Sequence, residues 1–227
     1  MQNASFLASK VTGTDFSNSD LRGSDMSLIE GTPIYENTIL SDGKIMNYTN
    51  GSLIIYEYKP TNVGGEMISA KFANDSIISA GAQLALYLGS EVEILNGATL
   101  TIANGSSIII NTDADSSTSF KVNSGGGLAF ENGAILEINV VSDMSARDTL
   151  QIVIMDFDDG ARIAGLDALI KDETIQLSVN GSKWLGEWDY ALENNQMLIT
   201  VAVPEPAVCA AAIGALSLLL AVRRRMR

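Results

Sequence analysis

The sequence contains no histidine and only one cysteine, and both scarcities limit its chemistry. Without histidine, Ser-His-Asp and Cys-His catalysis are excluded, and the commonest metal ligand is missing. The cysteine, Cys209, lies in an apolar segment near the C-terminus, so the chain ahead of it has neither a disulfide nor a thiolate metal site. We therefore expect a body held together by repetitive β hydrogen bonding rather than by covalent cross-links.

Basic residues are also few. The chain has 14 Lys and Arg against 27 Asp and Glu, and its formal charge is −13. Four of the basic residues lie in the last five positions, which leaves 10 against 27 acidic residues in the rest of the chain, a body near −17. Such a body is repelled by nucleic acid and by anionic membrane surfaces. The 227 residues, 46% of them hydrophobic, are enough for one large domain or two small ones.

The C-terminal segment 203–227 has three parts in a fixed order. Val203-Pro204-Glu205-Pro206 precedes the uncharged segment Ala207–Val222, which precedes a basic cluster at Arg223, Arg224, Arg225 and Arg227. As a helix, the uncharged segment spans ~24 Å, and snorkelling arginines bring it to the ~30 Å of a hydrocarbon core. The cluster stays cytoplasmic and leaves the body outside. We predict a single C-terminal transmembrane helix; the alternative is an ordinary buried helix.

This order resembles the PEP-CTERM sorting signal of Gram-negative bacteria, in which a Pro-Glu-Pro motif, a transmembrane helix and an arginine cluster follow one another. Here the motif is Pro204-Glu205-Pro206. The resemblance implies an exosortase-type sorting enzyme as partner, cleavage near the motif, and transfer from a single-pass membrane precursor to the cell surface or extracellular matrix. It also makes exopolysaccharide a further partner. The mature protein would lack the helix.

The first residues do not match that route. Met1-Gln2-Asn3-Ala4 shows neither the basic region nor the apolar region of a secretory signal peptide. We expect Met1 to be internal to a longer gene product; the alternatives are a degraded or mis-started copy, or a tail-anchored protein whose body is cytoplasmic.

Apolar residues recur every five positions near the N-terminus, at Phe6, Val11, Phe16, Leu21 and Met26. A small residue stands two positions before each of them, and an aspartate directly precedes the last three. Residues 1–30 thus resemble the pentapeptide-repeat family, whose coils are square β-helices. Five repeats make little more than one coil, so we expect this segment to begin a longer solenoid. The alternative is a Ser/Asp-rich segment with chance spacing.

We expect residues 31–148 to form a β-solenoid with eight-residue repeats, in which residues 31–78 match the repeat poorly. Glycines stand eight positions apart at Gly81, Gly89, Gly97 and Gly105, and the pattern recurs at Gly133. Three and five positions after each glycine comes an aliphatic pair: Leu84 and Leu86, Val92 and Ile94, Leu100 and Ile102, Ile108 and Ile110, Leu136 and Ile138. The offset of two puts each pair on one face of a strand, and glycine supplies the positive φ of a corner.

Two closures fit these units. Three strands and three corners make a right-handed parallel β-helix of ~24 residues per turn, similar to autotransporter-passenger solenoids. Alternatively, Asn-Gly corners make hairpins and an antiparallel β-meander or sandwich. We favour the all-β solenoid because its stacked strands leave few free edges. Residues 149–202 are expected to form a small β cap, with one short helix over 161–171.

Few residues suggest chemistry. Asp156, Asp158 and Asp159 follow a strand, but their spacing does not match a calcium loop, so we interpret them as a solvated turn. Trp184, Trp188 and Tyr190 are either packing residues at the end of a sheet, which we favour, or a sugar-stacking platform. We predict no catalytic residue, no cofactor and no metal.

These patterns predict a non-catalytic, exported surface or matrix protein with a structural or adhesin-like role. The alternative is a carbohydrate-binding or polysaccharide-degrading β-helix protein, which needs a groove with two carboxylates, or with one carboxylate and a Lys or Arg. A cytosolic DNA mimic built on the pentapeptide segment is a third hypothesis, and the sorting tail argues against it.

The sorting hypothesis predicts the behaviour of one variant. Replacing Pro204, Glu205 and Pro206 by alanine removes the motif and keeps the apolar segment, so the protein should remain in the membrane fraction, unprocessed. Immunoblotting of membrane and extracellular fractions measures this. Normal processing of the variant would refute exosortase sorting.

Overall fold

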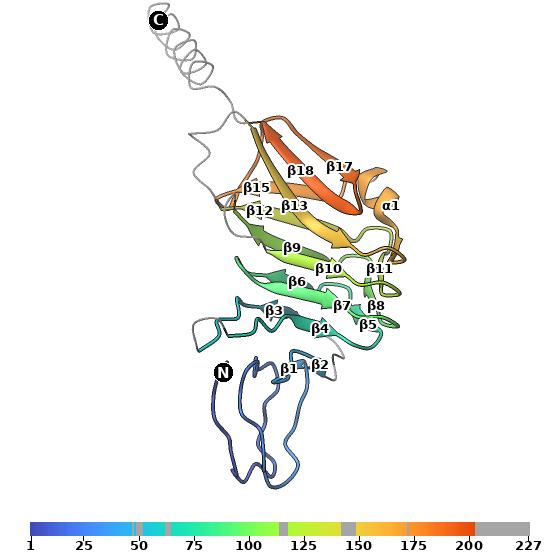
Figure 1. Cartoon of the computed structure of the whole chain (residues 1–227). Helices are drawn as coiled ribbons and strands as arrows, with labels where there is room; N and C mark the ends of the chain where they lie inside the picture. The colour runs from blue at the N-terminus through green and yellow to red at the C-terminus, as the bar shows by residue number, and fades with distance from the viewer. Residues whose placement is uncertain are drawn as a thin grey trace, which may run out of the picture.

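The computed structural model describes residues 1–46, 48, 52–61, 65–113, 118–141, 149–171 and 173–202. Within them the chain is all-β apart from one short helix, α1 (Leu166–Lys171). Its strands stack in layers between an N-terminal coil and a C-terminal cap (Figure 1). Across this part of the chain, no helix has the length and apolar character needed to span a membrane. The sorting motif at 203–206, the apolar segment Ala207–Val222 and the arginine cluster lie outside the described residues.

The N-terminal coil, residues 1–46, is built from five-residue units. Val11, Phe16 and Leu21, three of the expected apolar positions, are buried at its centre. The segment ends in two short antiparallel strands, β1 (Thr38–Ile39) and β2 (Ile45–Met46). Isolated parallel bridges join residues 19 or 20 positions apart, so that four units make one turn: Ser5 with Asp25, Lys10 with Glu30, Asp15 with Ile34, and Asp20 with Ile39.

Aspartates close the corners of this coil. The carboxylate of Asp15 accepts a hydrogen bond from the backbone N–H of Ser17 (2.8 Å), and that of Asp25 accepts one from Ser27 (2.9 Å). This is an Asx turn, in which a short side chain takes the place of a backbone carbonyl. The hydrogen bonds also hold the pKa values of both carboxyls below their ordinary value. The aspartates of the period-of-five pattern therefore shape the corners.

Arg22 joins the N-terminal coil to the layers that follow. Its side chain is fully buried and forms an ion pair with Asp20 at 2.7 Å. The guanidinium donates hydrogen bonds to the carbonyl oxygens of Tyr56 (2.6 Å) and Ile68 (3.0 Å). It also lies 5.5 Å from the ring centroid of Tyr58. These partners compensate a charge that would otherwise be costly to bury.

Three ladders of strands make up the body. The first contains β3 (Leu53–Ile55), β6 (Gln83–Leu86), β9 (Ser107–Thr112), β12 (Ile135–Val140), β15 (Ile175–Val179) and β16 (Ser182–Lys183). The second contains β4 (Ala70–Phe72), β7 (Glu91–Ile94), β10 (Ser119–Val122), β13 (Thr149–Phe157), β18 (Gln196–Ala202) and β17 (Trp188–Glu193). The third contains β5 (Ser76–Ile78), β8 (Thr99–Ile102), β11 (Gly127–Phe130) and β14 (Arg162–Ala164).

The chain visits the three ladders in turn. From β3 to β12, each strand pairs in parallel with the strand three places later in the sequence. One circuit is the stretch of chain between two residues that lie opposite each other in one ladder. The circuit from Leu84 to Ile108 is three repeat units long, and the circuit from Leu100 to Leu128 is four positions longer. Consecutive repeat strands do not pair as hairpins in the described chain. The antiparallel meander is therefore not the arrangement of these repeats.

The interior matches the aliphatic pattern of the sequence. All five aliphatic pairs expected to point inward are buried, which confirms that prediction. The five expected corner glycines all have positive φ, between 72° and 81°. Corners also stack: the backbone N–H of Gly81 donates to the carbonyl of Gly105 (2.9 Å), and that of Gly105 donates to Gly133 (3.0 Å). Backbone hydrogen bonds therefore continue from layer to layer through the corners.

The C-terminal cap changes the pairing from parallel to antiparallel. β13 pairs in parallel with β10 on one side and antiparallel with β18 on the other, and β17 forms the edge beyond β18. The helix expected over 161–171 is shorter than predicted. Arg162–Ala164 instead forms β14, because it continues the parallel register of β11, and Gly165 (φ 77°) separates it from α1. Leu166 and Leu169 of α1 are buried in the core cluster.

Two corner glycines form a matched pair for a stability test. Gly97 (φ 81°) has open space around an added Cβ, whereas a Cβ on Gly165 would overlap the carbonyl oxygen of Phe130. Gly97→Ala should cost about 1 kcal/mol from left-handed backbone strain alone. Gly165→Ala should cost about 1–3 kcal/mol more, because the layers must also move apart. Urea unfolding measures both, and equal losses would contradict this description of the corners.

The ion pair of Arg22 makes stability depend on pH. Burial opposes ionisation of Asp20, but hydrogen bonds from Arg22 and Gln2 outweigh it, so the pKa of Asp20 lies below its ordinary value. A carboxylate whose pKa is lower in the folded state adds stability that is present above the unfolded pKa and lost as the pH falls through the folded one. Arg22→Met should lower the free energy of unfolding by about 3 kcal/mol at neutral pH, because it leaves the carboxylate of Asp20 without its ion-pair partner.

Asp20→Asn removes the titrating group, so its free energy of unfolding should fall less steeply than that of the wild type below about pH 4. Urea unfolding at a series of pH values measures this, and an equal loss of free energy of unfolding in Asp20→Asn and wild type below that pH would contradict it.

Candidate functional site

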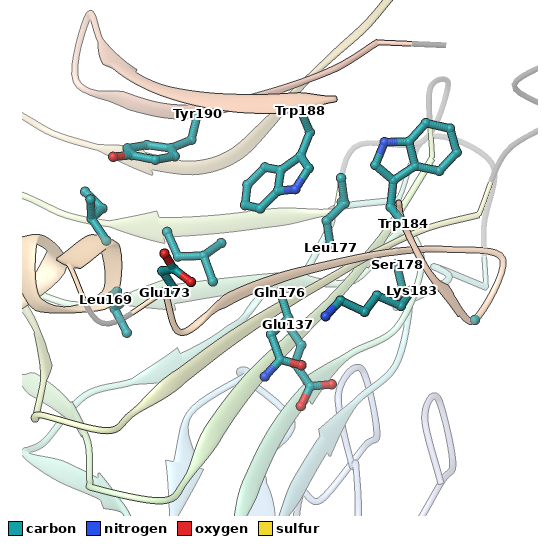
Figure 2. Close-up of a pocket in the computed structure, with 13 residues that line it drawn as sticks. Glu137, Leu169, Glu173, Gln176, Leu177, Ser178, Lys183, Trp184, Trp188 and Tyr190 are labelled. Atoms are coloured by element: carbon teal, nitrogen blue, oxygen red, sulfur yellow. The ribbon is translucent and has the colours of Figure 1, made fainter. Parts of the chain in front are cut away.

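A groove of about 660 Å³ lies at the C-terminal end of the body. Its lining comes from the last strands of the first ladder, from α1 and the turn after it, and from the edge strand β17. Leu169, Ile175 and Leu177 contribute an apolar floor, and all three are buried. Figure 2 shows aromatic side chains reaching into this space from β17, with polar side chains on the facing strands. The groove is the place where the first ladder meets the cap.

Trp188 and Tyr190 form one wall. They stand two residues apart on β17, so their side chains project from the same face of the strand. In the antiparallel register Trp188 lies opposite Val201 and Tyr190 opposite Ile199, and both partners are buried. Each aromatic ring packs on the core but is only partly buried. Part of each ring is therefore presented to the groove.

Trp184, which follows β16, closes one end of the groove. Its backbone N–H donates to the carbonyl of Leu177 (2.9 Å), and its indole N–H donates to the carbonyl of Glu187 (3.3 Å). Gly186 lies against the indole, since a Cβ added there would stand only 2.7 Å from Cζ2 of the ring. A larger residue would push the indole away. The ring is thus held in place by the protein itself before any ligand is present.

Polar side chains form the opposite wall. Glu137 lies opposite Gln176 in the parallel register of β12 and β15, and Lys183 of β16 extends toward Glu137 (Figure 2). Glu173, in the turn after α1 (φ 54°), adds a second carboxylate, and Ser178 of β15 adds a hydroxyl. Two carboxylates, one ammonium group, one amide and one hydroxyl thus surround an apolar floor. A few polar groups around apolar and aromatic walls are typical of sites for small polar ligands.

The structure brings together some of the residues that the sequence singled out. Trp184, Trp188 and Tyr190 all pack on the core, as the favoured interpretation predicts, and all three also line the groove. The residues of the sorting motif and the arginine cluster fall outside the described chain and have no place in this site.

The aspartates after β13 are engaged in separate contacts. Asp158 forms an ion pair with Lys121 of β10 (3.1 Å), and Asp159 accepts a hydrogen bond from the amide of Asn195 (2.6 Å). The two contacts tie the end of β13 to β10 and to the turn between β17 and β18. Among the residues that the structure describes, no three carboxylates gather in a way that could hold a metal ion.

Sequence reasoning missed the polar wall. Glu137 and Gln176 stand a whole circuit apart in the sequence and become neighbours only through the register of β12 and β15. One signal was present: Glu137 lies between the inward residues Leu136 and Ile138, so the eight-residue pattern already placed it on the outer face. Glu173 and Lys183 lie in the cap, where no period operates.

No protein-family model, curated protein or solved structure matches this chain.

Proposed function

We propose that this chain is an exported, non-catalytic bacterial surface protein with an adhesin-like role, and that it holds carbohydrate in the groove. The observation that carries the proposal is the set of three aromatic side chains, Trp184, Trp188 and Tyr190, around an apolar floor with a polar opposite wall. A pyranose ring has C–H groups on its faces and hydroxyls around its rim. It therefore suits a site that offers both aromatic faces and hydrogen-bonding groups.

In this proposal the body is a right-handed parallel β-helix. Support comes from the parallel ladders that the chain visits in turn, with inward aliphatic residues stacked from layer to layer. Crossover connections between parallel strands of one sheet are right-handed in about 98% of cases. Such a body needs no disulfide and presents long, regular outer faces, which suits a protein that works outside the cell.

Delivery to the surface rests on the tail. Pro204-Glu205-Pro206, the apolar segment Ala207–Val222 and the final arginines support a membrane-anchored precursor that an exosortase-type enzyme processes. Because an acidic body is repelled by nucleic acid, the proposed partner outside the cell is a polysaccharide. The sorting tail and the groove thus both support exopolysaccharide as the partner.

A second candidate function is polysaccharide cleavage. Glu137 and Glu173 favour it, because glycoside hydrolysis uses two carboxylates that flank the bond to be broken. The two candidates differ in outcome, since a hydrolase releases new reducing ends and a binding protein does not.

The groove proposal predicts the effect of removing an aromatic ring. Trp184→Ala and Trp188→Ala should each weaken binding of neutral β-1,4-linked glucose or N-acetylglucosamine oligosaccharides at least about tenfold, because each variant lacks one aromatic ring on which a sugar can stack. Isothermal titration calorimetry measures the affinities. Leu192→Ala is the matched control: Leu192 lies on β17, as Trp188 does, and is 51% exposed, but it does not line the groove.

Wild-type affinity in both tryptophan variants would reject the groove as the binding site. Release of reducing ends by the wild type, abolished in Glu137→Gln, would replace the binding proposal with the hydrolase.

A further inference from the structure

The outer face of the first ladder leads into the groove. Tyr56 and Tyr87 directly follow β3 and β6, and the register continues the same column through β9, β12 and β15. Its members, in order along the molecule, are Tyr56, Tyr87, Asn111, Asn139 and Ser178. Strands ~4.8 Å apart make this column ~19 Å long. Ser178 is its last member and also lines the groove, so column and groove are continuous.

The far end of the column is an exposed aromatic pair. The ring centroids of Tyr56 and Tyr87 are 4.9 Å apart at 34°, and each residue is 48% exposed. Their main chains are fixed, because the carbonyl of Tyr56 accepts a hydrogen bond from the buried Arg22 and the N–H of Tyr87 donates to Ile55 (2.9 Å). Adjacent large aromatic residues on a rigid surface mark interaction sites more often than single exposed apolar residues do.

The middle of the column is an ordered row of amides. The side-chain amide of Asn139 donates to the side-chain oxygen of Asn111 (2.9 Å), and that of Asn111 donates to the carbonyl of Leu86 (2.8 Å). The hydroxyl of Ser178 donates to the side-chain oxygen of Asn139 (3.0 Å). These bonds set the orientation of each amide, and an amide nitrogen carries two N–H groups. The row therefore presents polar groups at the spacing of the strands.

The second ladder provides a contrast. Its outward residues alternate in charge and lie opposite one another in register: Lys71, Glu93, Lys121 and Asp156. Opposite charges facing each other across strands stabilise a sheet, which gives this face a structural explanation. By contrast, the five members of the column on the first ladder carry no charge, and Glu137, which shares the outer face of β12 with Asn139, is negative. A ligand that lies along this column therefore meets uncharged groups, and the charge of −13 disfavours polyanions.

We propose that the groove is one end of a longer binding track, in which an extended neutral polysaccharide lies along the first ladder and stacks on Tyr56 and Tyr87 at the other end. The spacing supports this, since the ~4.8 Å between strands is close to the advance of one sugar unit in an extended β-1,4-linked chain. Each layer then meets one sugar. This inference rests on the proposed carbohydrate binding and adds the class of ligand and its direction.

The test compares ligands of two lengths. Disaccharides and hexasaccharides of β-1,4-linked glucose and of N-acetylglucosamine are titrated into the full chain, with polygalacturonate hexasaccharide as the anionic comparison. The neutral hexasaccharide should bind at least about tenfold more tightly than its disaccharide, and more tightly than the anionic one. In Tyr56→Ala/Tyr87→Ala the advantage of the hexasaccharide should disappear, while disaccharide affinity is unchanged.

Controls separate folding from binding. Tyr56→Phe/Tyr87→Phe keeps both rings and should keep the length advantage. Ile77→Ala, at a residue 55% exposed on the third ladder, should leave both affinities unchanged. The binding track is refuted if the wild type binds the hexasaccharide no more tightly than the disaccharide, or if Tyr56→Ala/Tyr87→Ala keeps the higher affinity for the hexasaccharide. Either result leaves the proposed binding in the groove intact. If neither neutral ligand binds the wild type, the proposed carbohydrate binding falls as well.

Discussion

Backbone hydrogen bonding between layers is the interaction on which the rest of the structure depends. Because side chains alternate along a strand, a slip of one residue in the pairing of β6 with β9 would turn Leu84 and Leu86 outward and Ala85 inward. The strand register therefore determines both which side chains are buried and which line up in columns on the outer face. With no cysteine in the described chain, the register is maintained by these bonds, by stacked corners such as Gly81 on Gly105, and by aliphatic packing.

Sequence periodicity predicted the corners and the buried pairs of the repeat strands, but it left open how those strands pair. The glycine period of eight placed the corners correctly, and the offset of three and five placed the buried pairs, because both signals reflect local rules of φ and strand alternation. The predicted helix began too early, since Arg162–Ala164 has helix-compatible residues but forms β14 by pairing with β11. A non-local pairing outweighed the local preference there.

The site was harder to foresee. Trp184, Trp188 and Tyr190 were noticed as a group because they lie close together in the sequence, but Glu137 and Gln176 meet only because the chain completes a whole circuit between them. Arg22 escaped notice for a related reason. Its place in the five-residue unit is equivalent to that of Leu7 and Ser27, which are exposed, and only the backbone of Tyr56 and Ile68 lying over it makes it a buried residue. Such contacts between distant segments leave no periodic trace.

The length of one circuit has a consequence for how such a protein can change. The circuit from Leu84 to Ile108 is three repeat units long and the circuit from Leu100 to Leu128 is longer, yet all four residues are fully buried. Extra residues are thus absorbed between the strands without disturbing the strands themselves. Duplication of one circuit would lengthen the molecule by a single strand spacing of ~4.8 Å and leave both ends intact. Gain or loss of whole circuits would therefore change the distance between the tyrosine pair and the groove in steps of one layer.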